Sequence, residues 1–363
     1  MNPNAFAAAP VASPHAHGGG SVARTMRHVQ LALLPATLHG FWLYGWPSFL
    51  LWLLTILACV GWEALALRLA GGRRVGAVLH DGSALLTGWL LAMTLPPWAP
   101  WWVAVVGGFI AIVVGKQVFG GLGQNVFNPA MVARVALLVS FPLPLTQWVA
   151  PLAQPAPGFV DALQRFLGGA PVPDAMTSAT LLGHARTELS RGVDLMQVLA
   201  GAPPSSLSWL GERAGSFGEA GALLLLAGGG YLLAVGVIRW HAPFAVLAGL
   251  AVPAAIAHAV DPARYLDAGS HLLSGAAMLG AFFIATDYVT SPSTVPGRLL
   301  FGAGVGLLTW IIRSWGGYPE GMAFAVLLMN ALTPTIDRCV RPRILGRDRR
   351  GRPLDLPPGS PRQ

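Results

Sequence analysis

Charge is scarce in this sequence. Asp, Glu, Lys and Arg make up 10% of the 363 residues, whereas charged residues form about a quarter of a typical soluble domain. Hydrophobic residues reach 54%, and the mean hydropathy is +0.59. This composition excludes a water-soluble globular domain and indicates a polytopic membrane protein that lies in a lipid bilayer.

Cysteine is also scarce: Cys59 lies inside one apolar run and Cys339 near the end of another. Two thiols cannot form a disulfide framework, a four-ligand zinc site or an iron–sulfur cluster held by this chain alone. We therefore expect no metal site, and any redox chemistry must use another cofactor. The net charge of +8 would suggest nucleic acid in a soluble chain. In a membrane protein, basic residues between the spans instead indicate which loops lie in the cytoplasm. We therefore expect no nucleic-acid partner.

Apolar runs divide the chain, each near or somewhat below the ~20 residues that cross a bilayer. Residues 1–28 lack the basic start and apolar core of a signal peptide and are expected to form a flexible tail. A polar, proline-punctuated stretch at 149–218 separates two groups of runs. We therefore expect an all-α protein of about ten transmembrane helices. The runs cover residues 29–49, 50–69, 75–95, 101–114 and 126–148, then 220–238, 243–260, 272–289, 299–312 and 322–336.

Basic residues follow a one-sided pattern along these runs. Arg24 and Arg27 precede the first run, and Lys116, the only lysine, follows the fourth. With ten spans these positions share one side of the membrane, so the positive-inside rule places both termini in the cytoplasm and residues 149–218 outside. A cytoplasmic place at the end of a span explains the charge of Lys116. The same side carries Arg68, Arg73, Arg74, Arg239, Arg298, Arg338, Arg341 and Arg343.

Two short patterns recur across the two groups of runs. The segment 82–88, Gly-Ser-Ala-Leu-Leu-Thr-Gly, resembles 269–275, Gly-Ser-His-Leu-Leu-Ser-Gly, and Phe119-Gly-Gly resembles Trp315-Gly-Gly. Five spans separate the copies, and an odd number reverses their direction, as in the inverted repeats of many transporters. The sequence thus predicts two inverted five-helix repeats, although small residues can also recur by chance at helix starts.

Three aspartates lie near or inside apolar runs, where an unpaired carboxylate is costly. Asp81 and Asp267 each precede Gly-Ser at the start of a helix, so we interpret them as helix caps. For Asp287 two interpretations stay open, a structural role or a cation or proton path. The glycines at 120–123 lack the Lys-Ser/Thr ending of a P-loop. We expect them to form a broken segment whose backbone lines a cavity or a cofactor site.

The segment 174–180, Asp-Ala-Met-Thr-Ser-Ala-Thr, is more specific. It matches the recognition pattern of the flavin transferase that esterifies FMN through its phosphate to the last threonine hydroxyl. We therefore expect Thr180 to be the acceptor, with Asp174, Thr177 and Ala179 as recognition residues. The modifying enzyme must bring a bulky FAD to the hydroxyl, so we expect an exposed loop. By composition alone this is an ordinary Ser/Thr-rich loop.

Almost the whole chain resembles the RnfD family of the Rnf electron-transport complex, which is related to NqrB of the sodium-pumping NADH:quinone reductase. The resemblance rests on residues 12–15, 24–35, 81–88, 115–130, 174–180, 280–287 and 313–325. The family often has Pro at the position of Leu181, and Gly-Glu-Thr-Ser where residues 218–221 read Gly-Glu-Ala-Gly. The reductase usually has Gly-Thr-Gly-Lys-Asn where 121–125 read Gly-Leu-Gly-Gln-Asn, so the Rnf resemblance is the better one.

The resemblance implies a membrane subunit of a redox-driven ion translocase in the bacterial inner membrane, inactive alone and with no catalytic side chain of its own. It implies FMN on Thr180, a noncovalent flavin such as riboflavin, and electron flow between ferredoxin and NAD pools coupled to sodium or proton movement. The implied partners are the other membrane and peripheral subunits and the flavin transferase. The alternatives are NqrB of a quinone reductase and a solute channel or carrier. The expected organisation is a cytoplasmic tail (1–28), a first repeat (29–148), a periplasmic flavin-bearing loop (149–218), a second repeat (219–337) and a basic cytoplasmic tail (338–363).

Overall fold

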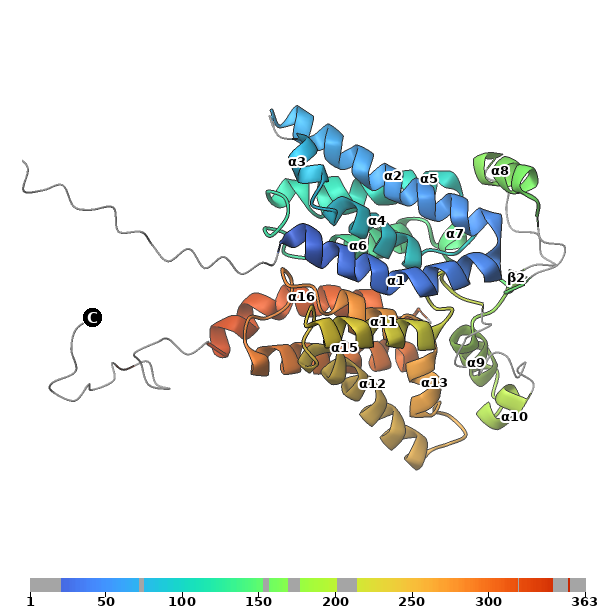
Figure 1. Cartoon of the computed structure of the whole chain (residues 1–363). Coiled ribbons are helices and arrows are strands. Elements are labelled where there is room, and N and C mark those ends of the chain that lie inside the picture. The colour runs from blue at the N-terminus through green and yellow to red at the C-terminus, as the bar shows by residue number, and fades with distance from the viewer. Residues whose placement is uncertain are drawn as a thin grey trace, which may run out of the picture.

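The computed structural model describes residues 21–71, 75–152, 157–168, 177–200, 214–318, 320–341 and 352. These residues are mostly helical, and the described part contains one pair of strands, β1 (Trp148–Val149) and β2 (Thr177–Ser178), joined antiparallel. The start of α1 (Val22–Tyr44) and the end of α16 (Met322–Cys339) lie at one end of the molecule (Figure 1). The helices α8 (Phe159–Gly168), α9 (Leu181–Ser190) and α10 (Leu195–Ala200) lie at the opposite end.

The first half of the chain opens with two long helices, α1 and α2 (Trp46–Leu69). The Ser21 hydroxyl accepts the Arg24 amide at 3.2 Å, so α1 begins at Val22. The prediction that residues up to 28 form a tail is therefore wrong for the last seven, because a serine cap starts the helix before the apolar run does. Gly45, with φ of 69°, separates α1 from α2.

The third expected span is interrupted. It consists of α3 (Val75–Leu79) and α4 (Ser83–Thr94), divided at Gly82 with φ of 77°. Asp81 accepts the Ser83 amide at 2.7 Å, but it lies one residue before the N-cap of α4, which is Gly82. The interpretation of Asp81 as the cap residue is therefore wrong by one position. The fourth span runs through α5 (Trp101–Phe109), the π-helix η1 (Ile110–Val114) and the 3₁₀ turn η2 (Gln117–Phe119). The fifth is α6 (Pro129–Ser140), followed by the short α7 (Pro142–Thr146).

The second half contains α11 (Ala222–Val235), α12 (His241–Val260), α15 (Val295–Trp315) and α16, with a broken element between α12 and α15. That element is α13 (Ala268–Leu273), α14 (Ala277–Leu279) and the π-helix η5 (Gly280–Ile284). Asp267 caps α13 by accepting the Ser270 amide at 3.1 Å, as predicted. Burial opposes its charged form, yet the hydrogen bonds from Ser270 hold the pKa of Asp267 below its ordinary value.

Four described helices are long and apolar enough to cross a membrane: Trp46–Leu69, Trp101–Phe119, His241–Val260 and Val295–Trp315. Shorter apolar helices cover Ser83–Thr94, Pro129–Ser140 and Ala222–Val235. The expectation of a helical membrane protein is confirmed, whereas the number of ten spans stays a prediction. Prolines and glycines with a left-handed backbone conformation interrupt several helices within the apolar runs. A hydropathy profile does not show these interruptions.

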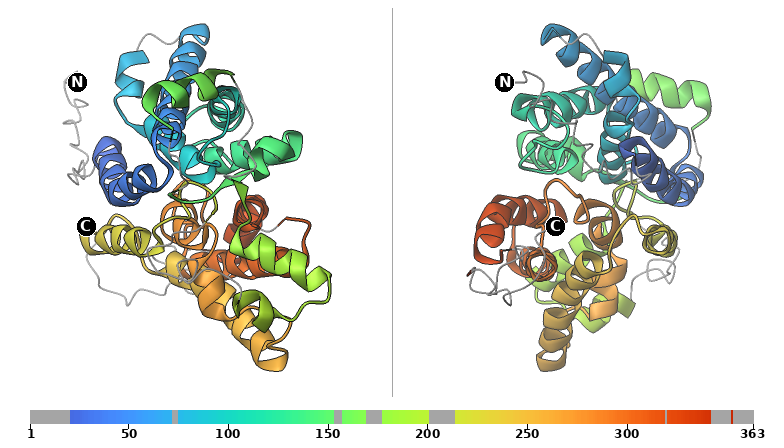
Figure 2. Two further views of the ribbon diagram at one scale, coloured as in Figure 1. Left: turned by 90° about the vertical axis from the view of Figure 1, so that its right-hand side faces the viewer. Right: turned by 60° about the vertical axis from the view of Figure 1, so that its left-hand side comes forward.

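The two halves meet through a small set of helices. The first half lies above the second in Figure 1 and in the left view of Figure 2. Contacts between them join α1 to α11 and α6 to α16, whereas α2 contacts α4 and α5 in the first half and α12 contacts α13 and α15 in the second. A Cβ at Gly228 of α11 would lie 2.3 Å from the Ala32 carbonyl oxygen of α1. The glycine therefore permits close helix packing, as small residues do in membranes.

Residues 149–218 contain more regular structure than the expected loop. Their described parts form the strand pair and the helices α8, α9 and α10. Leu182 and Ala185 of α9 pack with Leu195, Val198 and Leu266 in a small cluster of their own. This segment therefore rests on the connection between α12 and α13, because its apolar side chains need partners that a free loop does not offer.

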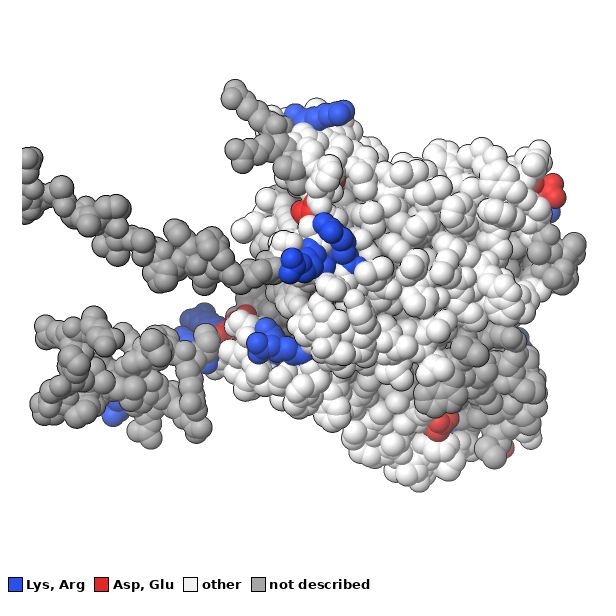
Figure 3. Space-filling model, in the orientation of Figure 1, with Lys and Arg blue, Asp and Glu red and all other residues white. Residues whose placement is uncertain are grey.

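Lys and Arg side chains gather over one end of the visible face, near the start of α1 and the end of α16 (Figure 3). The broad middle of that face is almost free of charge. An uncharged belt with basic residues at one end is what a bilayer-spanning protein presents.

Candidate functional site

Thr180 is the N-cap of α9. Its hydroxyl oxygen accepts the Gly183 amide at 3.0 Å, and its carbonyl accepts the His184 amide at 2.8 Å. Only 9% of the residue is exposed. The expectation of an exposed loop hydroxyl is therefore wrong, because a capping hydroxyl is turned back onto the first turn of its own helix. This position places Oγ at the positive end of the α9 dipole.

An open groove lies beside Thr180, with about 720 Å³ of empty space including its mouth. Ser178 and Ala179, both exposed, form part of its wall. The pairing of Trp148 with Ser178 holds the segment before Thr180 against β1. The other lining residues are Thr146, Trp148, Gly183 and Thr187. The groove thus combines a hydroxyl at a helix N-terminus with an indole ring on the facing strand.

The recognition residues are only partly visible. The Thr177 backbone lies in β2, and Ala179 lines the groove, whereas Asp174 lies outside the described residues. Sequence reasoning missed Trp148, which joins the groove from about 30 residues upstream. Its only sequence signal is its place in the short run Gln-Trp-Val-Ala after a proline-rich turn, and such a run does not identify its partner strand.

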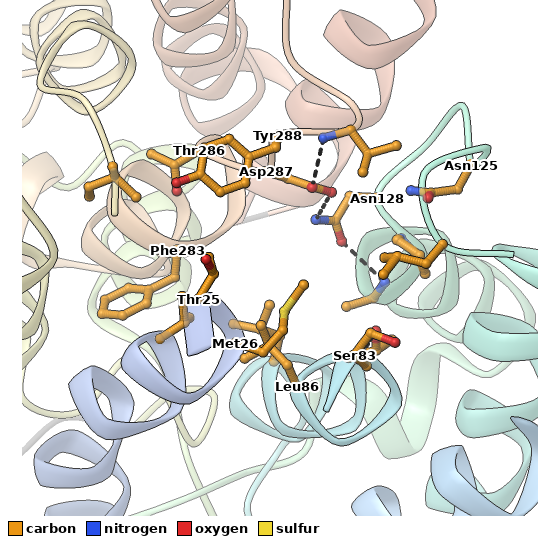
Figure 4. A pocket seen from close by; sticks show the side chains of 18 of the residues that line it. Thr25, Met26, Ser83, Leu86, Asn125, Asn128, Phe283, Thr286, Asp287 and Tyr288 are labelled. Atoms are coloured by element: carbon orange, nitrogen blue, oxygen red, sulfur yellow. Dashed lines mark hydrogen bonds between the residues drawn. The ribbon is translucent and has the colours of Figure 1, made fainter. Parts of the chain in front are cut away.

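A second cavity lies between the two halves, near the start of α1. It encloses about 800 Å³ of space, including its open mouth. Thr25 and Met26 of α1, Ser83 and Leu86 of α4 and Phe283 of η5 surround it in Figure 4. Leu122 and Asn125 also line it, so the glycine-rich segment 120–123 borders a cavity as the sequence predicts. Both halves of the chain contribute to this one space.

Asp287 lies on the wall of this cavity and is already hydrogen-bonded. It accepts the Val289 amide at 3.1 Å and the Asn128 side-chain amide at 3.4 Å (Figure 4). It also accepts the Thr290 hydroxyl at 3.2 Å. Asn330 accepts the Asn128 backbone amide at 3.1 Å. These contacts join the start of α6 to the second half. These hydrogen bonds agree with a structural role for Asp287. A role in a cation or proton path stays a prediction, because Asp287 also lines the cavity.

Lys116 does not lie on the surface. Its Nζ is 2.6 Å from Glu63 Oε1 and 2.6 Å from Ser83 Oγ, and the Lys116 and Glu63 side chains are 2% and 0% exposed. Gln117 donates to the same Glu63 oxygen at 2.8 Å. A position at the cytoplasmic end of a span therefore does not by itself explain the charge of Lys116. A buried ammonium needs a carboxylate partner, and Glu63 on α2 could not be paired with it from the sequence.

A second buried ion pair lies in the other half. Arg313, at the end of α15, donates to Glu320 at 2.8 Å and to the carbonyls of His271 at 2.7 Å and Ser274 at 3.0 Å. Glu320 in turn accepts the amides of Ala276 at 3.1 Å and Met322 at 2.9 Å. The pair therefore fastens the broken α13–α14 element to the turn between α15 and α16.

Comparison with known proteins gives the family. Residues 10–346 match the NQR2, RnfD, RnfE family. Three relatives share one name, the ion-translocating oxidoreductase complex subunit designated D. The chain is 52% identical over 347 residues to that of Halorhodospira halophila, covering 95% of this chain and 97% of that protein. It is 52% identical to that of Stutzerimonas stutzeri, covering 92% and 95%, and 42% identical to that of Escherichia fergusonii, covering 92% and 97%. The chain therefore belongs to the NQR2, RnfD, RnfE family.

Proposed function

We propose that this chain is the membrane subunit of an ion-translocating electron-transport complex and carries FMN as a phosphoester on Thr180. The observation that carries the proposal is the Thr180 hydroxyl at the N-terminus of α9, on the wall of an open groove. The relatives named as subunits of an ion-translocating oxidoreductase complex support the electron-transport role. Bound flavin supplies one-electron and two-electron chemistry, and the chain holds it in place.

The residues around Thr180 suit a phosphoester. The first amides of a helix have no intrahelical acceptor, and the helix dipole favours negative charge there, so a phosphate at this end is stabilised. Thr180 Oγ can accept the Gly183 amide whether it is free or esterified. Trp148 offers an aromatic surface beside the groove for the ring of the flavin. Because Thr180 is only 9% exposed, the flavin transferase would have to reach its hydroxyl from the groove, where Ala179 and Gly183 are small.

The cavity between the halves is our candidate for the second, noncovalent flavin, such as riboflavin. Phe282 and Phe283 offer aromatic side chains, and Asn125 and Asn128 offer amides that can donate to and accept from a flavin ring. Two flavins would then lie toward opposite ends of the molecule, one beside the start of α1 and one beside α9.

We further propose two inverted repeats with both termini in the cytoplasm and residues 149–218 in the periplasm of a bacterial inner membrane. In two repeats related by a two-fold axis, a helix that lies near the axis packs against the corresponding helix of the other repeat. The contacts of α1 with α11 and of α6 with α16 have this form, because these are the first and last helices of the two halves. The basic end of the molecule, opposite α8 to α10, supports the orientation (Figures 1 and 3).

The test is the substitution Thr180→Asn. Asparagine caps a helix as well as threonine does but cannot be esterified in this way. We expect the variant to insert and assemble normally, and to lose its yellow-green flavin band under ultraviolet light after denaturing electrophoresis. The matched variant Ser178→Ala should keep the band. Thr180→Val removes the cap as well and should cost about 1 kcal/mol of local stability. Comparison of Thr180→Asn with Thr180→Val therefore separates the loss of the ester from the loss of the cap.

Retention of the fluorescent band in Thr180→Asn would refute the acceptor assignment. Absence of a band in the unsubstituted protein, when it is coexpressed with its flavin transferase, would favour a solute channel or carrier instead. If the band is present, ferredoxin-linked reduction of NAD by the purified complex, coupled to sodium or proton uptake, distinguishes this role from that of NqrB in a quinone reductase.

A further inference from the structure

A third cavity lies on the far face of α9 from Thr180. Thr180, Gly183 and Thr187 recur at spacings of three and four residues and share one helix face. Leu182, Ala185, Arg186 and Leu189 share the opposite face and line a separate cavity, whose empty space, including its open mouth, is about 1030 Å³. The other lining residues are Ser190, Arg264, Tyr265, Leu266, His271, Arg313, Ser314 and Trp315. This space therefore lies outside the proposed flavin groove.

The lining is cationic. Arg186, Arg264 and Arg313 contribute guanidinium groups, and none of the described lining residues is an acid. Arg313 is paired with Glu320, whereas the salt bridges among the described residues include neither Arg186 nor Arg264. Two buried nitrogens on the lining residues, Nδ1 of His271 and Nε of Arg313, also have no hydrogen-bond partner within the described part of the chain. Arg186 donates to the Tyr318 carbonyl oxygen at 3.4 Å and Arg264 lies over the Tyr265 ring at 5.7 Å, so both have neutral partners. Guanidinium groups with no carboxylate partner among the described residues favour an anionic ligand.

The cavity lies at the depth where lipid headgroups are found. Ser314 and Trp315 belong to the last turn of the membrane-crossing helix α15, and Arg264 and Tyr265 follow the end of α12. Tyr265 and Trp315 meet edge to face at 6.1 Å, and such aromatic side chains mark the membrane interface. Below Arg264, α12 exposes Val252, Ile256 and Val260. The helix that leads to Arg264 thus offers exposed apolar side chains that acyl chains can contact.

We propose that this cavity binds the phosphate group of an anionic phospholipid from the leaflet next to α9. Arg186 and Arg264 pair with the phosphate, and the acyl chains lie along the exposed face of α12. A bound lipid then ties α9, which carries Thr180 at its start, to the ends of α12 and α15. This inference concerns the opposite face of α9 and does not depend on whether Thr180 carries flavin.

The test is lipid binding by the full chain, purified in detergent and stripped of lipid. Native mass spectrometry would measure binding of phosphatidylglycerol and phosphatidylcholine to the parent protein and to the double variant Arg186→Gln/Arg264→Gln. We expect the parent to prefer phosphatidylglycerol, and the double variant to bind it roughly 30-fold more weakly. Arg165→Gln/Arg191→Gln is the matched control, because it removes the same charge from exposed positions of α8 and of the residue after α9.

Equal binding of the two lipids by the parent protein would overturn the proposal, as would an equal loss in the control variant. Inorganic phosphate is the probe for a small anion. If it displaces phosphatidylglycerol at concentrations similar to that of the lipid, the cavity is a small-anion site and the lipid assignment is wrong. Melting temperatures of all variants, measured without added lipid, separate a binding defect from misfolding.

Discussion

At the residue scale, the buried ion pairs show how a sparingly charged chain uses the charge it has. Lys116 precedes Phe119-Gly-Gly, and Arg313 precedes Trp315-Gly-Gly. Each cation is buried, pairs with a glutamate and donates to one copy of the repeated Gly-Ser segment, to Ser83 in 82–88 for Lys116 and to the His271 carbonyl in 269–275 for Arg313. The similar placement in the two halves agrees with the proposed inverted repeat and extends it from backbone pattern to side-chain chemistry.

Breaking the pair in the first half should be costly. We expect Lys116→Met to lower stability by roughly 3–5 kcal/mol, because it leaves the Glu63 carboxylate buried without a counterion. The double variant Glu63→Gln/Lys116→Met should recover most of that loss, since no uncompensated charge remains. Thermal unfolding of the detergent-purified protein measures both. A double variant no more stable than Lys116→Met would contradict this account.

An exposed pair provides the comparison. Arg191 lies 2.9 Å from Glu188, but its side chain is 68% exposed, and exposed pairs contribute under about 1 kcal/mol. We therefore expect Arg191→Gln to leave the melting temperature nearly unchanged. A loss as large as that of Lys116→Met would mean that burial does not set the cost of breaking an ion pair in this protein.

At the element scale, the approach of α11 to α1 depends on one face of a three-glycine run. A Cβ at Gly228 would meet the Ala32 carbonyl at 2.3 Å, and one at Gly229 would meet the Phe282 ring at 2.4 Å, whereas nothing lies within 4 Å of a Cβ at Gly230. Helices in membranes associate through such small-residue faces. The contact matters for the whole fold, because α1 and α11 belong to different halves.

The three-glycine run provides a matched pair of variants. We expect Gly228→Ala to push α11 away from α1 and to lower the melting temperature and the yield of assembled protein. Gly230→Ala should be neutral or slightly stabilising, because alanine favours a helix by about 1 kcal/mol over glycine. Equal behaviour of the two variants, measured by thermal unfolding and size-exclusion chromatography, would remove close packing as the reason for Gly228.

At the scale of the whole molecule, the two ends differ. The helix termini at one end carry the basic residues, and the other end carries α8 to α10. Cys339 is exposed near the end of α16, and Cys59 is buried. Gln164 on α8 is exposed at the other end. The chain therefore offers one native and one engineered position for a test of membrane orientation.

We expect Gln164→Cys, in a Cys59→Ala/Cys339→Ala background, to react with a membrane-impermeant maleimide added to whole cells. The native Cys339 should react only after the cytoplasm is opened. The reverse pattern would invert the topology, and labelling of both from outside would exclude opposite faces. Cys59, with no exposed surface, should resist labelling in the folded protein and serves as the internal control.

The sequence by itself determined the class of protein and its family. Low charge, long apolar runs and one-sided arginines are properties of composition and order, so they are legible without coordinates. The assignment of the segment 174–180 as a flavin acceptor stays a prediction, and it could be made from sequence because a modifying enzyme reads a short local pattern. The cap role of Asp267 was predictable for the same reason, since a cap acts within two or three residues of itself.

Only the tertiary structure decided which distant residues meet. It paired Lys116 with Glu63, brought Asn128 to Asp287 across the two halves, placed Trp148 beside Thr180 and opened a basic cavity behind α9. A hydropathy profile could not predict these pairings. A helix that is apolar on all sides can bury any of its faces, and its neighbours in the fold decide which one. The profile also could not show that Thr180 is turned inward, since a hydroxyl in a polar segment is exposed or capping depending on where the next helix begins.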